Sequence, residues 1–249
     1  NSWQDRATSK INEWREQKGK NKQGFFAVNM ASTGCGKTFA NAKIMRAAAD
    51  DGASLRYILA LGLRTLTLQT GDEYRNRIGL DDTELAVLIG SKAVTELHHQ
   101  ASSEIRMRQE GLDNIDTGSE SLQPLLDEEI DYQCAIPEGV LTTVLSRKRD
   151  WQFLHAPVLA CTIDHLISAT ESRRGGKYIL PSLRLLSSDL VIDEIDDFSG
   201  SGLIAIGRLI HLAGMLGRKV MISSATISPD LAEGYLNAYQ RGWRLYSQT

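Results

Sequence analysis

Phosphate-binding chemistry is indicated by residues 28–38, which read VNMASTGCGKT. This segment ends an apolar run, contains two glycines and leads into a sequence whose apolar residues recur at helical spacing. Gly34 and Gly36 allow backbone N–H groups to approach an anion, and the positive end of the following helix dipole points to the same place. Lys37 is then placed to reach the β- and γ-phosphates of a nucleotide, and the Thr38 hydroxyl is placed to hold a bridging magnesium ion.

One residue of this P-loop departs from the formal pattern. The pattern G-x-x-x-x-G-K-[ST] requires glycine where the chain has Ala31, although the small size is kept. The alternative interpretation is a glycine-rich turn that only joins a strand to a helix. The predicted ATP contacts of the loop are Ser32, Thr33, Gly34, Cys35, Gly36, Lys37 and Thr38.

Acidic side chains for metal and water chemistry follow a second apolar run, in the sequence SSDLVIDEIDDF. Asp193 and Glu194 fall at the carboxyl end of the predicted strand, where ligands bind in open parallel sheets. Asp193 can hold magnesium, and Glu194 can orient and deprotonate the water that attacks the γ-phosphate. The alternative is a solvated acidic turn, because four of the five residues 193–197 are carboxylates. A solvated turn would leave the apolar strand before it unexplained.

The elements that position these residues are predicted from periodicity. Helices are predicted to begin at Lys37, near Gly62, near Pro181, near Ser201 and at Pro229, the last with a serine N-cap. Their alternation with strands predicts an α/β fold with a mainly parallel sheet and helices on both faces. The strand-like runs are FFAVNM, LRYILAL, ELAVLIG, PVLACTI, DLVID and KVMISSA.

Composition and charge set limits on the class of protein. A chain of 249 residues that is 42% hydrophobic can form one large α/β domain. No apolar run approaches the roughly 20 residues that span a bilayer, and the N-terminus is no signal peptide, so a cytoplasmic protein without membrane contact is expected. Residues from about 91 to about 156 are polar, acidic and irregular, which predicts a mostly helical insertion.

Four stretches together resemble the first RecA-like lobe of superfamily 2 helicases. They are ASTGCGKT for motif I, ALGLRTLTLQTG for motif Ia, VIDEID for motif II and SSAT for motif III. That superfamily often has alanine at the position of Ala31. The segments MASTGCGKT, VLACTIDHLISAT and DEIDDF most resemble the corresponding motifs of the helicase-nuclease of type I CRISPR systems, subtype I-F. In that subtype the helicase is fused to an adaptation subunit.

The resemblance implies catalytic roles for three residues of the two motifs. Lys37 would hold phosphates, Asp193 would hold magnesium together with Thr38, and Glu194 would act on the attacking water. Gln4 stands where related helicases read adenine with a glutamine, because an amide can pair with both the donor and the acceptor of that base edge. An ordinary surface glutamine is the alternative for this position.

The resemblance also implies coupling and DNA-binding residues. Ser224 and Thr226 resemble the motif that couples nucleotide state to the grip on DNA, through hydroxyl bonds to Asp196; the alternative is a strand end that caps the next helix. Many relatives have histidine at the position of Asp196. For His165 the alternative is a place in the core or on the surface. The residues expected to contact single-stranded DNA are Gly62, Arg64, Thr65, Thr162, Asp164 and His165.

The function implied for residues 1–249 is that of the ATP-binding lobe of an ATP-dependent DNA translocase in CRISPR interference, with ATP and Mg²⁺ as cofactors. The second lobe, with its arginine fingers, and the nuclease domain are expected outside this chain, so the isolated fragment is expected to be nearly inactive. Expected partners are single-stranded DNA, the second lobe, a crRNA-guided surveillance complex, the CRISPR integrase and phage-encoded inhibitors. An RNA helicase, a restriction-type motor and a nucleotide-gated scaffold that does not hydrolyse ATP are the alternatives.

Overall fold

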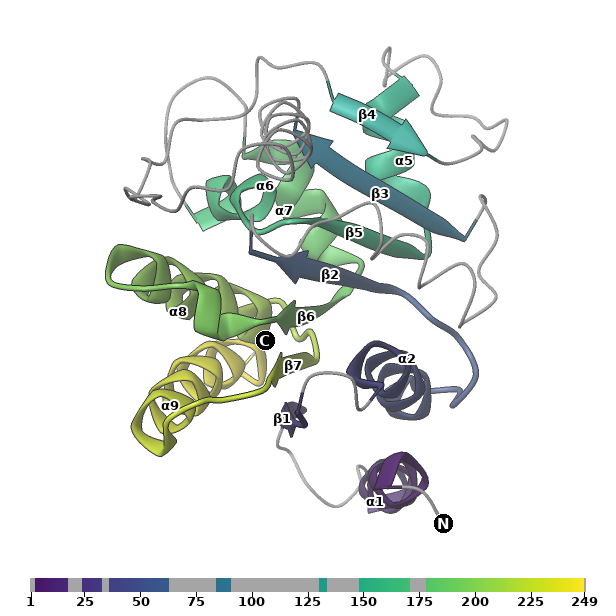
Figure 1. Cartoon of the computed structure of the whole chain (residues 1–249), viewed down its shortest axis with the longest axis vertical. Helices are drawn as coiled ribbons and strands as arrows, with labels where there is room; N and C mark the ends of the chain where they lie inside the picture. The colour runs from purple at the N-terminus through teal and green to yellow at the C-terminus, as the bar shows by residue number, and fades with distance from the viewer. Residues whose placement is uncertain are drawn as a thin grey trace, which may run out of the picture.

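A seven-stranded sheet forms the centre of the computed structural model (Figure 1). The structure describes residues 3–17, 24–32, 36–62, 84–90, 130–133, 148–170 and 178–248. The strands lie in the order β1-β7-β6-β2-β5-β3-β4, and all neighbouring pairs are parallel except β3 and β4. The strands are β1 (Phe26–Met30), β2 (Tyr57–Leu61), β3 (Leu85–Gly90), β4 (Ile130–Gln133), β5 (Val158–Thr162), β6 (Asp189–Asp193) and β7 (Val220–Ser224).

The prediction of a mainly parallel sheet is confirmed, and each of the six predicted runs contains a strand. The antiparallel edge strand β4 was not predicted, because its four residues IDYQ lie in an acidic stretch without an apolar run. β4 and the following helix are the parts of the predicted insertion that the structure describes, and the rest of the insertion lies outside the described residues.

Helices cover both faces of the sheet (Figure 1). Those predicted to begin at Lys37, Ser201 and Pro229 begin there, the one expected near Pro181 begins at Ile179, and the start expected near Gly62 lies outside the described residues. The helices are α1 (Trp3–Gln17), α2 (Lys37–Ala48), α5 (Lys148–His155), α6 (Asp164–Ile167), α7 (Ile179–Leu186), α8 (Ser201–Met215) and α9 (Pro229–Tyr246), with short 3-10 turns η4 (Ser168–Thr170) and η5 (Ile195–Asp197). No described helix combines the length and the apolar content needed to cross a membrane.

Alternating strand residues divide the core into two layers, as the two-residue period of a strand requires. Ile58 and Ala60 of β2 pack in the layer that contains α7, α8 and α9. Tyr57, Leu59 and Leu61 of the same strand pack in the opposite layer, against α2 and the apolar side of α1. Because both faces are covered, the strands read as continuous apolar runs, which is why they could be found in the sequence.

The first helix was not predicted, although its sequence carries a weak signal. Ala7, Ile11 and Trp14 recur at helical spacing and pack against the core layer of α2, while none of the helix residues is fully buried. The Trp14 ring contacts Phe25 edge to face at 4.9 Å between centroids, and Arg15 Nη1 donates to the Ala47 carbonyl oxygen at 2.9 Å. These contacts hold α1 beside the P-loop helix.

The α8–α9 pair packs closely because of its glycines. A Cβ atom at Gly242 would lie 2.0 Å from the carbonyl oxygen of His211, whereas a Cβ atom at Gly234 would meet nothing within 4 Å. We therefore expect Gly242→Ala to lower the free energy of unfolding by about 2 kcal/mol, because the helices must separate. Gly234→Ala should raise it by up to about 1 kcal/mol, through better helix propensity. Urea denaturation measures both, and equal effects of the two variants would contradict the close packing.

Candidate nucleotide-binding site

The carboxyl ends of β1, β7 and β6 gather the residues of the two predicted motifs. β7 lies between β1, which leads into the P-loop, and β6, which ends at Asp193. Met30 of β1 is in register with Ser224 of β7, and Asp193 is in register with Ser223. The sheet order therefore brings together two segments separated by some 160 residues of chain, at the edge where parallel sheets bind ligands.

The P-loop helix begins with a glycine in a conformation that other residues rarely adopt. Gly36 has φ 76° and ψ 37°, in the left-handed region, and Lys37 and Thr38 form the first turn of α2. Ser32 precedes the loop and is exposed, while Thr33, Gly34 and Cys35 lie outside the described residues. The N-terminal end and the dipole of this 12-residue helix are thus directed to the place where the motif predicts phosphate.

Lys37 is the group that defines the site electrostatically. Its side chain is 8% exposed, and its Nζ atom is buried without a hydrogen-bond partner among the described residues. Glu194 Oε1 lies 3.8 Å away, which is an ion pair but not a hydrogen bond. A buried ammonium group with no closer anion is costly, so this arrangement suits an anionic ligand such as a phosphate chain.

Asp193 is a buried carboxylate beside this cation. Burial raises the pKa of Asp193, and a hydrogen bond with the Ser223 side chain and the positive charge of Lys37 oppose that rise. Its Oδ1 atom accepts a hydrogen bond of 3.1 Å from the backbone N–H of Glu194. A hard oxygen ligand at this position fits Mg²⁺, whose charge would favour the ionised carboxylate that burial alone disfavours.

Glu194 has a left-handed backbone conformation, with φ 53° and ψ 55°. Among the described residues it alone combines a positive φ with a side chain. Such a conformation costs roughly 1–2 kcal/mol for a residue other than glycine. It turns the chain at the end of β6 and allows the Glu194 carboxylate to reach the vicinity of Lys37, so the strain is located where the sequence predicts the catalytic base.

Gln4 lies against the P-loop. Its Nε2 atom donates to the carbonyl oxygen of Gly36 at 3.3 Å, across 32 residues of chain. The helix that carries it is fixed to α2 by Arg15 and by an ion pair of 3.5 Å between Lys43 and Asp5. Gln4 is therefore close enough to the nucleotide site for the predicted contact with a base, a role that stays a prediction.

The three predicted coupling residues meet on the other side of β7. The Ser224 hydroxyl is hydrogen-bonded to the Asp196 carboxylate, and the same Oγ atom lies 2.7 Å from the Thr226 carbonyl oxygen and 3.3 Å from the Thr226 nitrogen. The bond from Ser224 to Asp196 is the one expected from the sequence. Thr226 joins this group through its backbone carbonyl oxygen and nitrogen.

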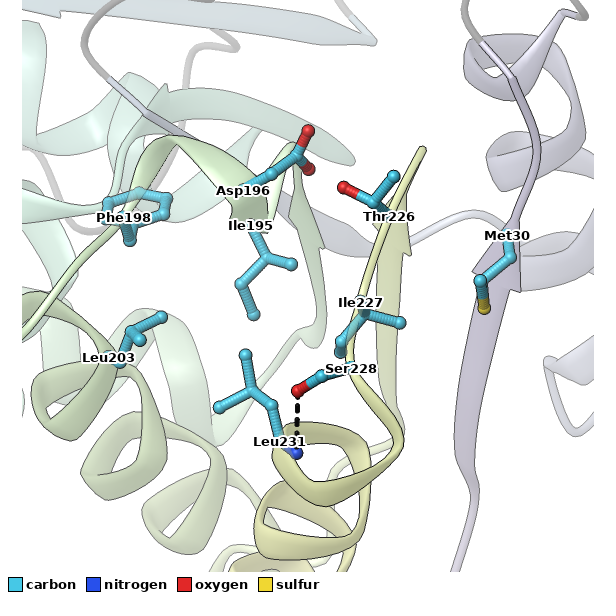
Figure 2. A pocket seen from close by; sticks show the side chains of 9 residues that line it. All are labelled: Met30, Ile195, Asp196, Phe198, Leu203, Thr226, Ile227, Ser228 and Leu231. Carbon is cyan, nitrogen blue, oxygen red and sulfur yellow. Dashed lines mark hydrogen bonds between the residues drawn. The ribbon is translucent and has the colours of Figure 1, made fainter.

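A pocket of about 410 Å³ opens beside this group (Figure 2). Figure 2 shows Asp196 and Thr226 at its rim, with Ile195, Leu203 and Leu231 directed into it. The Ser228 hydroxyl accepts a hydrogen bond from the Leu231 nitrogen at 3.3 Å and so caps α9, as predicted. The wall of the pocket is mainly apolar, which distinguishes it from the charged nucleotide site.

Of the predicted DNA-binding residues that the structure describes, Gly62, Thr162 and His165 are buried and Asp164 is half-buried. Gly62 follows β2 and Thr162 ends the neighbouring strand β5, where Ile163 N donates to Leu61 O at 3.0 Å. Thr162 and His165 are only 1% and 7% exposed, however, and their Oγ1 and Nδ1 atoms lie 2.7 Å apart. Arg64 and Thr65 lie outside the described residues.

The burial of His165 decides its charge. Burial lowers its pKa to about 4, so the imidazole is neutral at physiological pH and offers no cation to a phosphate. Burial also raises the pKa of the neighbouring Asp164. The described geometry therefore favours the core interpretation of His165 and a role for this turn in positioning the edge, rather than in direct phosphate contact.

Three buried polar residues near the P-loop were not found in the sequence: Asn29, Asn41 and Ser223. Asn29 stands in an otherwise apolar strand, and Asn41 follows Lys37 by one helical turn. These positions could have indicated a buried polar contact, because an amide that faces the core between sheet and helix needs a hydrogen-bond partner there.

The raised pKa of Asp193 predicts a gain of stability when its charge is removed. Because the folded protein holds the proton to a higher pH than the unfolded chain, ionisation of Asp193 lowers stability as the pH rises from about 4 through the folded-state pKa. Asp193→Asn should therefore raise the melting temperature of the nucleotide-free protein at pH 7 and remove this part of the pH dependence. Thermal unfolding between pH 4 and pH 8 measures it, and a variant less stable than wild type at pH 7 would contradict the assignment.

Comparison with known proteins identifies relatives over the whole chain, although no family model matches it. The chain is 46% identical to the "CRISPR-associated nuclease/helicase Cas3 subtype I-F/YPEST" of Pseudomonas aeruginosa strain UCBPP-PA14, and 49% identical to the protein of the same name from Pectobacterium atrosepticum. Each match covers 99% of this chain and 22% of the relative, so the chain spans about a fifth of the length of these proteins.

A solved structure shares the fold. The crystal structure described as T. fusca Cas3-ADP matches 92% of this chain and 23% of its own chain, with a TM-score of 0.56 and 19% identity. At that identity the match supports the RecA-like fold and leaves the roles of individual residues to the geometry above. The resemblance to subtype I-F proteins, first seen in the motifs, is confirmed by whole-chain identity.

Proposed function

We propose a function for a chain that is homologous, over its whole length, to a region of the Cas3 subtype I-F nuclease/helicases: it is the ATP-binding lobe of a CRISPR-associated helicase that moves along single-stranded DNA. The observation that carries the proposal is the buried Lys37 Nζ atom, which has no hydrogen-bond partner among the described residues and lies beside the carboxylates of Asp193 and Glu194. An ammonium held in this way, at the start of a helix that follows a Gly-rich loop, suits the phosphates of ATP.

In this proposal each of these residues has a separate role in ATP hydrolysis. Lys37 binds the β- and γ-phosphates, Thr38 and Asp193 hold Mg²⁺, and Glu194 orients the attacking water and accepts its proton. Bound Mg²⁺ would neutralise part of the negative charge of the phosphates. Gln4 is proposed to contact the base, since its amide already lies at the Gly36 carbonyl.

The DNA path is proposed to cross the carboxyl ends of β2 and β5, next to the nucleotide site. Gly62 and the backbone that follows it offer N–H groups, and Arg64 is the proposed cation. Contacts of this kind are tolerant of sequence and sensitive to salt, as a translocating motor requires. Thr162, Asp164 and His165 are proposed to shape this edge from within.

The partners and the cellular location are proposed from the homology alone. The whole protein is proposed to act in the cytoplasm with a second helicase lobe and a nuclease domain, neither of which is assigned to residues 1–249. Its proposed partners are a crRNA-guided surveillance complex, the CRISPR integrase and phage-encoded inhibitors. An arginine from the second lobe would complete the site, so residues 1–249 alone should hydrolyse ATP very slowly.

Two substitutions separate binding from catalysis. In the complete natural polypeptide that contains this chain, Glu194→Gln should lower ATP turnover by roughly 10²-fold or more, because the water loses its base, while ATP binding is kept. Lys37→Ala should abolish both, because the phosphates lose their buried cation. ATP turnover and the binding of a fluorescent nucleotide are measured with single-stranded DNA, duplex DNA or RNA added.

Single-stranded DNA should raise wild-type turnover severalfold. Stimulation by RNA instead would favour an RNA motor, and turnover that responds to no nucleic acid would contradict the translocase. A Glu194→Gln variant that retains every activity would favour the alternative function, a nucleotide-gated scaffold that does not hydrolyse ATP.

Coupling is tested at Ser224. Ser224→Ala removes the hydrogen bond to Asp196 at the end of β7, so we expect basal ATP turnover to persist while stimulation by single-stranded DNA is lost. Ser228→Ala is a matched control in the same connection, because it removes the α9 cap and should cost about 1 kcal/mol of stability without affecting stimulation. Loss of stimulation in both variants would show a general effect of stability and contradict a coupling role.

A further inference from the structure

Five polar side chains form a buried layer between the sheet and α2. Asn29 of β1, Ser223 of β7 and Asp193 of β6 stand in one row, since Asn29 is in register with Ser223 and Ser223 with Asp193. Paired residues of parallel strands point to the same face. Asn29 Nδ2 donates to Asn41 Oδ1 of α2 at 2.8 Å, so this is the face that α2 covers, and Lys37 completes the layer.

All five side chains are withdrawn from solvent. Ser223 and Asn41 are fully buried, and Asn29, Asp193 and Lys37 are less than a tenth exposed. Asn41 Nδ2 and Lys37 Nζ have no hydrogen-bond partner among the described residues, whereas the Ser223 side chain interacts with the Asp193 carboxylate. Buried polar groups without partners are rare in folded proteins, and each requires an explanation. For Lys37 the proposed phosphate is the explanation, whereas Asn41 lies one helical turn further from the loop.

The position of α2 on the sheet depends on this layer. Four of its buried residues are alanines: Ala40, Ala42, Ala47 and Ala48. Small side chains restrict the rotation of a helix on a sheet only weakly, whereas a buried amide pair allows a single register, because any other leaves both amides unsatisfied. Asn41 lies one turn after Lys37 on the same side of the helix. A bond that fixes Asn41 therefore also fixes the point on the helix from which the Lys37 side chain extends.

We propose that Asn41, held by Asn29, is a positioning residue that sets Lys37 against Asp193 and so determines the affinity of the site for nucleotide together with Mg²⁺. Ser223 is the middle member of the row and transmits the position of β1 to the Asp193 carboxylate. The inference rests on the proposed function, because it assigns these residues to the same nucleotide site.

The test compares a polar pair with an apolar pair of similar size. In the complete natural polypeptide, the variants are Asn41→Ala, and Asn29→Val combined with Asn41→Leu. Ile44→Val is the matched control, since it lies on the same helix, is equally buried and carries no polar group. The readouts are the melting temperature and the dissociation constant of a fluorescent ADP analogue, measured with and without Mg²⁺, so that no turnover is needed.

We expect Asn41→Ala to reduce the Mg²⁺-dependent gain in nucleotide affinity at least tenfold. The apolar pair should regain the wild-type melting temperature but not that gain, and Ile44→Val should lower the melting temperature with the gain unchanged. An apolar pair that binds Mg²⁺ and nucleotide as wild type does would overturn the inference.

Failure of the proposed function gives a different result. A wild-type protein that binds nucleotide but shows no DNA-stimulated turnover would contradict the translocase, while the affinities of the variants still decide the role of Asn41. A wild-type protein that binds no nucleotide would overturn both. If Asn41→Ala does not fold, the apolar pair decides the inference by itself.

Discussion

The burial of the Lys37 ammonium is the constraint on which the site depends. A buried charge costs several kcal/mol, and an ion pair of 3.8 Å with Glu194 offsets this only in part. The neighbouring Asp193 is also buried, and burial raises its pKa. The fold thus holds two opposite charges in a geometry that does not maximise its own stability, which is expected of a site built for a polyanion and a cation.

β7 links the two sides of this site. Its last two residues are serines that point to opposite faces, because side chains alternate along a strand. Ser223 faces α2 and stands in register with Asp193, while Ser224 faces η5 and is hydrogen-bonded to Asp196. A shift of the carboxylates at the end of β6 therefore reaches both the P-loop helix and the connection to α9 through one strand. The apolar pocket beside Asp196 is lined by residues of that connection.

The proposed DNA edge is a direct neighbour of the ATP site. β6 pairs with β2, and β2 pairs with β5, so Gly62 and Thr162 lie within two strand spacings of Asp193, each about 4.8 Å. At this distance, a small movement of residues around the phosphates can directly shift the backbone at the proposed DNA edge. The bond between Thr162 and His165 holds a neutral imidazole at this edge.

The sequence by itself determined six of the seven strands, most of the helices, the phosphate-binding motif and the acidic motif. Runs such as DLVID and KVMISSA are local patterns, and the positions of Lys37, Asp193 and Glu194 at element ends follow from them. Tertiary structure alone decided which ends meet: that β7 separates β1 from β6, that Gln4 lies on Gly36, and that His165 turns inward. It also decided the pairing of Asn29 with Asn41, across twelve residues and two elements. The reason is physical, since periodicity records which face of an element is buried, whereas the neighbour that buries it is chosen by contacts between distant segments.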